Sequence, residues 1–348
     1  MSGPTVGIIG AGPGGLALGI LLARAGFRDF TMFDREDDVG GTWWINTYPG
    51  LACDVKSHLY SYSFDLNPDW SRLWSAQPEI LAHFQRCADK YGLRPHLRLR
   101  TEIRAARWQE GAQRWCLTTA EGERHHFDVL VSAVGLFTRP LLPDLAQEEP
   151  FTGTVMRSAR WDHSIPLAGK RIAVLGTGST ASQLLPELAK VAGKVYSVQR
   201  SPTWILPKPD RRYTRRERWA FAHVFFMLYG PNTNVGSNSV IFMLEAQARY
   251  IVRALKHMRR RDKTYIAVRP GALADFVAKI DRWMAGTVWT TQCSNYFRAA
   301  NGRVVTQWPG SARSFWGMTR RFKPGDFRFE PTAGSAPGAL TLSDRGAR

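Results

Sequence analysis

Two glycine-rich segments of this 348-residue chain carry the residues that a turn around a pyrophosphate needs. The first runs from Gly10 to Gly15 with the spacing GxGxxG, and the second runs from Gly176 to Ala181 with the spacing GxGxxA. Glycine lets the backbone approach phosphate oxygens closely, and a helix that starts at such a turn offers free N–H groups and a positive dipole end. Each segment is therefore predicted to bind the phosphates of a nucleotide.

The residue that follows each turn at the same distance differs in charge. It is Asp34 after the first turn and Arg200 after the second. A carboxylate at this place accepts hydrogen bonds from a ribose 2′-hydroxyl, whereas an arginine suits a 2′-phosphate. The first site is therefore predicted to bind FAD or NAD and the second to bind NADP, which favours a flavoprotein that takes hydride from NADPH. The residues predicted to contact these cofactors are Gly10, Gly12, Gly15, Asp34, Gly176, Gly178, Ser179, Arg200 and Ser201.

The elements that must position these turns are read from the apolar pattern around them. Strands are predicted at residues 6–9 and 30–33 around the first turn, and at 172–175 and 195–198 around the second. An amphipathic helix lies between the strands of each pair, so the βαβ pattern occurs twice. A single glycine-rich match is weak evidence, because ordinary strand–helix turns carry it too, but the repeated context favours ligand sites. The predicted fold class is α/β, with two Rossmann-like dinucleotide-binding units.

Composition and charge limit the other classes of protein. Hydrophobic residues make up 44% of the chain, as in globular proteins, and the formal net charge is +18. The charge is interpreted as solvated basic faces on a protein with two polyanionic cofactors, and no nucleic-acid partner is predicted because no such module is recognisable. The four cysteines form no CxxC pair or ligand cluster. We therefore predict reduced thiols, no metal site and a cytoplasmic location, with neither a signal peptide nor a transmembrane segment.

The segment after Asp34 resembles the GxWxxxxYPGxxxD signature of Baeyer–Villiger monooxygenases and related class B flavoprotein monooxygenases. The matching positions are Gly41, Trp43, Tyr48, Pro49, Gly50 and Asp54. A second family signature, FxGxxxHxxxW, is matched at Phe151, Gly153 and Trp161, but Arg157 stands where the family has histidine. The resemblance implies an FAD- and NADPH-dependent enzyme that inserts one oxygen atom from dioxygen next to the carbonyl of a ketone or a related apolar substrate, by way of a flavin peroxide.

Site residues follow from the resemblance and from one helix start. The signature implies that Asp54 is catalytic and lies near the flavin, while Gly41, Thr42, Trp43 and Tyr48 contact the cofactor. A helix is predicted from Asn238 to Leu255, and its N-terminus at Asn238 would face the negative charge of reduced flavin. Two alternatives stay open at this stage. Asp54 is also a candidate cap of the turn after Gly50, and Trp43 is also a candidate core aromatic.

The middle of the chain departs from the family pattern. Family members carry a long stretch there, with the rest of the NADP sheet and an active-site arginine, whereas here residues 215–219 run almost directly into residues 225–231. Asn295 also replaces the usual tryptophan. The chain therefore resembles a monooxygenase with a large internal deletion. An uncoupled flavin NADPH oxidase, a heteroatom oxygenase and a non-catalytic truncated remnant are the alternative functions.

The predicted organisation is an FAD domain that is split in the sequence by a truncated NADP unit. A helix is predicted from Pro78 to Tyr91, because proline favours the first turn and Gly92 ends the pattern. No oligomeric state is predicted. The predicted boundaries are 1–142 for the N-terminal part of the FAD domain, 143–169 for a linker, 170–222 for the truncated NADP unit, 223–330 for the C-terminal part of the FAD and substrate region, and 331–348 for a disordered tail.

Overall fold

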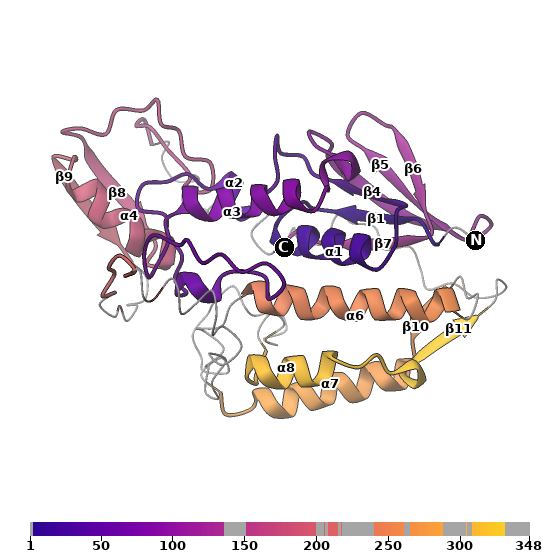
Figure 1. Ribbon diagram of the computed structural model, residues 1–348. Coiled ribbons are helices and arrows are strands. Elements are labelled where there is room, and N and C mark those ends of the chain that lie inside the picture. Colours follow the sequence, from indigo (N-terminus) through magenta and orange to yellow (C-terminus); the bar gives the residue numbers. More distant parts are fainter. Residues whose placement is uncertain are drawn as a thin grey trace.

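The first nucleotide unit is built on a parallel sheet of four strands in the order β3-β2-β1-β7 (Figure 1). The strands are β1 (Val6–Ile9), β2 (Phe30–Phe33), β3 (Leu97–Arg98) and β7 (Val129–Ser132). Every residue of the central strand β1 is buried, as expected for a parallel strand covered on both faces. The computed structural model describes residues 3–135, 151–199, 205, 208–214, 217, 240–260, 265–287, 304 and 308–330.

Three helices build the core on this sheet. Helix α1 (Pro13–Arg24) begins with a proline in its first turn, and Gly26 follows its end with a φ of +80°. Helix α3 (Gln77–Lys90) packs against α1, and so does α6 (Val240–Arg260), which comes from the far end of the sequence (Figure 1). A Cβ at Gly14 would lie 3.1 Å from the Leu244 side chain, so α1 and α6 approach closely at their N-terminal halves.

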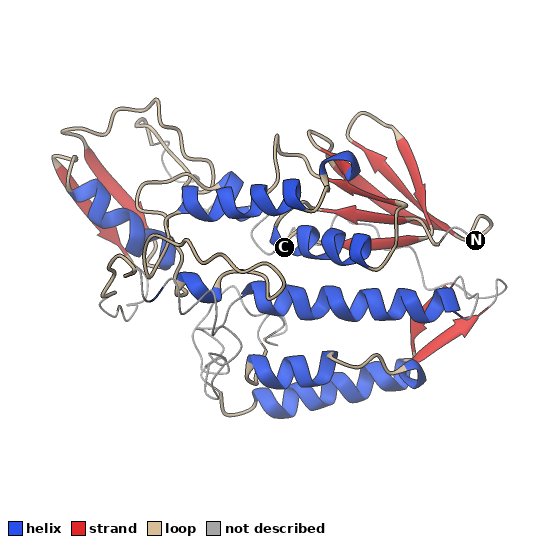
Figure 2. Cartoon of the chain, in the orientation of Figure 1, coloured by secondary structure: helices blue, strands red, loops and turns tan. Residues whose placement is uncertain are grey.

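A three-stranded antiparallel sheet lies beside the parallel one (Figure 2). Its strands are β4 (Ile103–Gln109), β5 (Arg114–Thr119) and β6 (Arg124–Phe127). The buried residues Ala106, Leu117 and Phe127 pack with Ile9 and Phe33 of the parallel sheet. The antiparallel sheet therefore covers part of the face of β1 and β2.

The second nucleotide unit consists of β8 (Arg171–Leu175), α4 (Ser179–Ala189) and β9 (Lys194–Val198). Its two strands are parallel, and within the described residues they pair only with each other. Helix α4 covers one face with the buried side chains of Leu184 and Leu188. On the other face, Leu175, Tyr196 and Val198 are 55%, 42% and 50% exposed.

The C-terminal part adds helices and one hairpin-like pair of strands. Helix α8 (Ala312–Thr319) packs on α6, with α7 (Pro270–Met284) beyond it in Figure 1. Strands β10 (Tyr265–Val268) and β11 (Phe327–Glu330) pair antiparallel. Short helical turns occur at α2 (Thr42–Ile45), Ser57–Leu59, Arg94–His96 and Pro324–Asp326.

The predicted fold class is confirmed, with a βαβ unit after each glycine-rich turn. The helix predicted from Pro78 to Tyr91 spans Gln77–Lys90 and is followed by Gly92 at a φ of +65°. The described part of the helix predicted from Asn238 begins at Val240 and extends beyond Leu255 to Arg260. The predicted tail, residues 331–348, lies outside the described residues.

None of the described helices is long and apolar enough to cross a membrane. No group of three or more His, Cys, Asp or Glu side chains that could hold a metal ion occurs in the same part of the chain.

Candidate functional site

The first glycine-rich turn has a backbone that other residues cannot adopt. Gly10 has a φ of +107°, its N–H donates to the carbonyl of Phe33 over 2.7 Å, and a Cβ there would lie 2.4 Å from the Ala133 carbonyl oxygen. A Cβ at Gly15 would lie 2.0 Å from the carbonyl oxygen of Gly10. These two glycines therefore let the helix start directly against the strand.

The backbone angles of the second turn are nearly the same as those of the first. Gly176 has a φ of +112°, and its N–H donates to the carbonyl of Val198 over 2.9 Å. Gly12 and Gly178 are the N-caps of α1 and α4, with φ and ψ of −72° and −175° in one and −69° and 178° in the other. Neither helix has a side-chain cap. Both helix N-termini therefore offer backbone N–H groups to an anion.

The signature segment folds onto the first turn. Gly40 has a φ of +125°, and its N–H donates to the carbonyl of Ala11 over 3.1 Å. Gly41 has a φ of +54°, and a Cβ there would lie 2.9 Å from the Cα of Gly12. Thr42, which is exposed, then begins α2. The predicted cofactor positions Gly12 and Gly41 are thus brought together by backbone contact.

Asp34 lies at the end of β2 with its carboxylate directed at the first turn. One oxygen accepts from the N–H of Ala11 over 2.7 Å, and the other accepts from the N–H of Glu36 over 3.0 Å. Burial raises the pKa of Asp34, while these two backbone hydrogen bonds act to lower it. A carboxylate has about four lone-pair sites, so acceptor capacity is left for the hydroxyls of a ribose.

Trp43 is a core residue in this structure, as one of the two interpretations predicted. Its side chain is 7% exposed, and its Nε1 donates to the Tyr60 hydroxyl over 3.1 Å. The two rings meet edge to face, and Gln77 donates to the Trp43 carbonyl over 2.6 Å. Trp43 therefore fixes α2 against α3.

Tyr48 ties the signature segment to the second nucleotide unit through Gln183 of α4. The buried Tyr48 hydroxyl donates to Oε1 of Gln183 over 3.0 Å, and burial raises the pKa of Tyr48. Gly50 has a φ of +80°, and a Cβ there would lie 2.4 Å from the carbonyl oxygen of Gln183. The Gln183 side chain also bonds both backbone groups of Ala52, accepting from N–H at 3.4 Å and donating to the carbonyl at 3.0 Å. The segment and α4 are therefore in direct contact.

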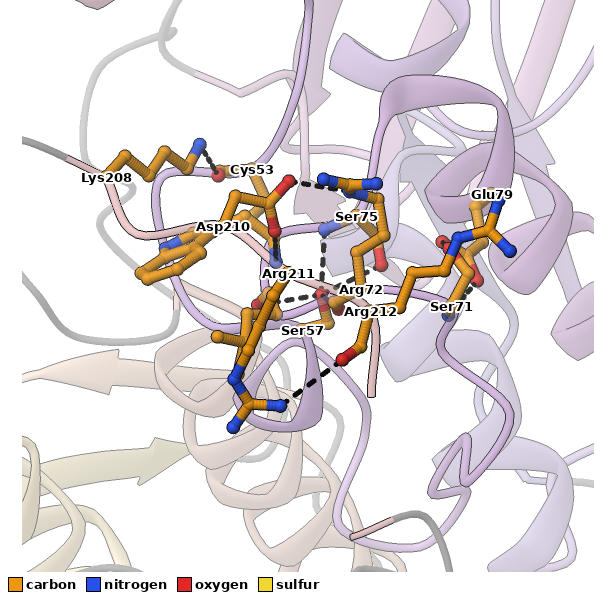
Figure 3. Close-up of polar contacts among 12 residues, drawn as sticks. Cys53, Ser57, Ser71, Arg72, Ser75, Glu79, Lys208, Asp210, Arg211 and Arg212 are labelled. Carbon is orange, nitrogen blue, oxygen red and sulfur yellow. Dashed lines mark hydrogen bonds and ion pairs between the residues drawn. The ribbon is translucent and has the colours of Figure 1, made fainter. Parts of the chain in front are cut away.

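Asp54 lies where the Tyr48–Asp54 segment meets α4, a contact here called the junction. Its side chain is 56% exposed. Nε2 of Gln183 donates to the Asp54 carboxylate over 2.8 Å. The ammonium of Lys208 lies 3.9 Å from the same carboxylate and donates to the Cys53 carbonyl over 2.7 Å (Figure 3). Among the described residues, Lys208 is the cation that lies within 4 Å of this carboxylate.

The linker segment makes a different contact. Arg160 donates with both terminal nitrogens to the carboxylate of Glu36, over 2.8 and 3.2 Å. Glu36 is mostly buried, and Arg160 and Arg35 together hold its pKa below the usual value against the opposing effect of burial. Arg157, which replaces the family histidine, is exposed. The linker therefore touches the first unit beside Asp34.

Several predicted site residues cannot be placed. Arg200, Ser201 and Asn238, together with Asn295, lie outside the described residues. Conversely, Gln183, Lys208 and Asp210 take part in the junction but lie outside the glycine-rich turns and both family signatures. Gln183 stands one helical turn after the predicted phosphate-binding Ser179, and this position on α4 was the one signal available.

Comparison with known proteins places most of the chain in one family. The family model described as flavin-binding monooxygenase-like matches residues 3–215. A Baeyer–Villiger monooxygenase of Pseudomonas aeruginosa is 44% identical over 216 residues, which are 62% of this chain and 41% of that protein. The FAD-binding monooxygenase ktnD of Aspergillus niger is 36% identical over 312 residues, covering 84% of this chain and 48% of that protein.

Solved structures show the same likeness. The cyclohexanone monooxygenase of Rhodococcus sp. Phi1 bound to NADP⁺ matches with a TM-score of 0.58 at 36% identity, over 63% of this chain and 43% of that one. OTEMO in complex with FAD and NADP matches with a TM-score of 0.59 at 31% identity, over 64% of this chain and 44% of that one. The chain thus spans less than half the length of these relatives.

Proposed function

The chain belongs to the flavin-binding monooxygenase-like family, and from this membership we propose that it binds FAD and NADP and acts as a Baeyer–Villiger type monooxygenase. Its substrates on this proposal are dioxygen and a ketone or a related apolar carbonyl compound. The observation that carries the proposal is the pair of glycine turns with matching backbone angles, each at the start of a helix that lacks a side-chain cap.

The first turn fits the pyrophosphate and ribose of FAD. At the start of α1 no side chain covers the backbone, because Gly10, Gly12 and Gly15 are glycines. A side chain at Gly10 or Gly15 would collide with neighbouring backbone atoms. Gly41, which lies against Gly12, likewise adds no side chain to this place. Asp34, beside this glycine-rich turn, can still accept hydrogen bonds from ribose hydroxyls. These residues would hold FAD.

The second turn fits the pyrophosphate of NADP. Among the described residues, a Cβ at Gly176 or Gly178 would have no heavy atom within 4 Å apart from the chain neighbours, so there is open space beside this turn. Ser179 begins α4 and adds a hydroxyl there. Arg200 and Ser201 would supply the charge-assisted hydrogen bonds to the 2′-phosphate.

The residues at the junction would orient the reacting groups. When bound, FAD supplies the oxidation–reduction chemistry between NADPH and dioxygen. The Tyr48–Asp54 segment lies between the two glycine-rich turns, since it follows Gly41 in the sequence and contacts α4 through Gln183. We assign Asp54 the role of a fixed negative charge there, with Gln183 and Lys208 as its partners.

An NADPH oxidase that releases peroxide is the second candidate, and one observation favours it. The chain matches only 41% of the Pseudomonas aeruginosa relative, so more than half of that protein has no counterpart in the match. A site that lacks those parts would have fewer groups to exclude water and hold a carbonyl substrate. Both candidates require bound FAD.

Flavin binding by the purified chain is the experiment that tests the proposal. The protein should show flavin absorbance as isolated or after incubation with FAD. Gly12→Val should abolish it, because the added methyl groups stand beside Gly41 at the start of α1. Gly111→Val is the matched control, since Gly111 lies in open space in the β4–β5 turn. Colourless wild-type protein that cannot be reconstituted would refute the proposal.

A further inference from the structure

Residues 208–213, here called the tether, run along the loop of residues 53–75 as an added strand-like segment (Figure 3). The N–H of Leu73 donates to the Arg211 carbonyl over 3.0 Å, and the N–H of Tyr213 donates to the Ser71 carbonyl over 3.1 Å. Arg72 and Arg212 face each other in an antiparallel bridge. The tether follows the second nucleotide unit in the sequence but binds a loop of the first.

Asp210 is the side chain that anchors the tether. One carboxylate oxygen accepts from Nε of Arg72 over 2.6 Å, and the other accepts from the N–H of Trp74 over 3.2 Å (Figure 3). The Asp210 side chain is only 25% exposed. Two charge-assisted hydrogen bonds to the same loop fix both the distance and the direction of the tether at this point.

Lys208 extends from the anchored tether to the Cys53–Asp54 peptide. Its ammonium donates to the Cys53 carbonyl over 2.7 Å, lies 3.9 Å from the Asp54 carboxylate and stands 5.6 Å from the centre of the Trp74 ring. The N–H of Cys53 donates to the Ser75 carbonyl over 3.0 Å. The Cys53 backbone is therefore held on both of its polar groups.

The other groups at this place have structural tasks. Burial raises the pKa of the Cys53 thiol to about 12, so the thiol stays protonated at neutral pH. At the far end of the tether, the Tyr213 hydroxyl and Nδ1 of His58 share a hydrogen bond of 2.7 Å. Burial lowers the pKa of His58 to about 4, which keeps its imidazole neutral and able to accept. The tether is thus secured on both sides of Asp210.

We propose that Lys208 and Asp210 are positioning residues, which fix the Asp54 carboxylate in the place where it meets Gln183 of α4. Asp54 is then held from two sides, by Gln183 of α4 and by Lys208 of the tether. Asp210 acts through Lys208, since it sets where the lysine stem begins. The proposal rests on the proposed function, because the place of Asp54 matters for turnover only if the chain binds flavin.

Hydrogen exchange of the cofactor-free protein tests the tether without reference to catalysis. In Asp210→Ala, the amide protons of Leu73 and Trp74 should exchange about tenfold faster than in the wild type, since both bonds hold the tether to the loop. If the alanine variant is poorly folded, Asp210→Asn takes its place, and its increase in exchange rate should be smaller. Asp37→Asn is the control, because Asp37 pairs with Arg100, both side chains are exposed, and neither belongs to the tether or its loop. Equal exchange in the Asp210 variants and the control would overturn the proposal.

Steady-state kinetics with the FAD-loaded protein tests the link to Asp54. Lys208→Met should lower kcat for NADPH oxidation about tenfold with little change in the KM for NADPH, and Lys208→Arg should restore part of the loss. A rise in KM with an unchanged kcat would show that Lys208 binds the dinucleotide and does not position Asp54. If the protein binds no flavin, the proposed function fails, and the exchange experiment still decides whether Asp210 anchors the tether.

Discussion

Replacing Gln183 by leucine removes the amide that joins α4 to the Tyr48–Asp54 segment. The change deletes a hydrogen bond to the buried Tyr48 hydroxyl at 3.0 Å, two to Ala52 at 3.0 and 3.4 Å, and one to the exposed Asp54 at 2.8 Å. Neutral hydrogen bonds contribute about 1 kcal/mol each, the longest one less, and the exposed one is weakened by solvent. We expect the free energy of unfolding to fall by about 2–3 kcal/mol, measured by urea denaturation.

A double-mutant cycle isolates the hydrogen bond between the Tyr48 hydroxyl and Oε1 of Gln183. Tyr48→Phe keeps the ring packed against Leu184 and Leu188 but removes its hydroxyl. The coupling energy between Tyr48→Phe and Gln183→Leu should be about 1 kcal/mol, because each substitution removes the same hydrogen bond. Ser182→Ala on the same helix is the control and should change stability by less than about 0.5 kcal/mol. Additive effects of the two substitutions would show that the amide and the hydroxyl do not interact.

Three further predictions concern cofactor choice, coupling and pH. Arg200→Ala should erase most of the preference for NADPH over NADH in steady-state kinetics, and equal use of both by the unmutated chain would contradict the assignment. NADPH oxidation should be largely uncoupled, with hydrogen peroxide formed in nearly the same amount as NADPH is consumed, because the resemblance implies that the family segment with the active-site arginine is missing here. Well-coupled ester formation from simple ketones would refute this. Burial lowers the pKa of His83 from 6.5 to about 4, so the folded state resists its protonation and the free energy of unfolding should fall by about 3 kcal/mol as pH drops from 6.5 to 4. Urea denaturation should show a flatter pH dependence in His83→Gln, and an unchanged slope would disprove the assignment.

The elements around the two turns were predictable because their signals are local. Apolar runs, glycine spacing and the charge at the strand end all lie within one βαβ unit. Gly10 and Gly176, far apart in the sequence, have φ values of +107° and +112°. The same local requirement therefore produced the same backbone twice.

The junction between the units was not predictable in the same way. Tyr48 and Gln183 are 135 residues apart, and a tyrosine–glutamine hydrogen bond leaves no periodic pattern in either segment. The signature gave the position of Trp43 but not the direction of its ring, which points into the core toward Tyr60. Lys208 was equally hidden, since a lone lysine beside prolines is typical of any exposed segment.

The exposed face of the β8–β9 pair has a consequence for the tendency of the protein to aggregate. Its outer side presents Leu175, Tyr196 and Val198 to water, and within the described residues both strands have an unpaired edge. Sheet edges with apolar neighbours template pairing between molecules, and the hazard grows with concentration and is greatest while a chain is newly synthesised. The high positive charge opposes this by mutual repulsion, so salt, which screens that repulsion, should promote precipitation.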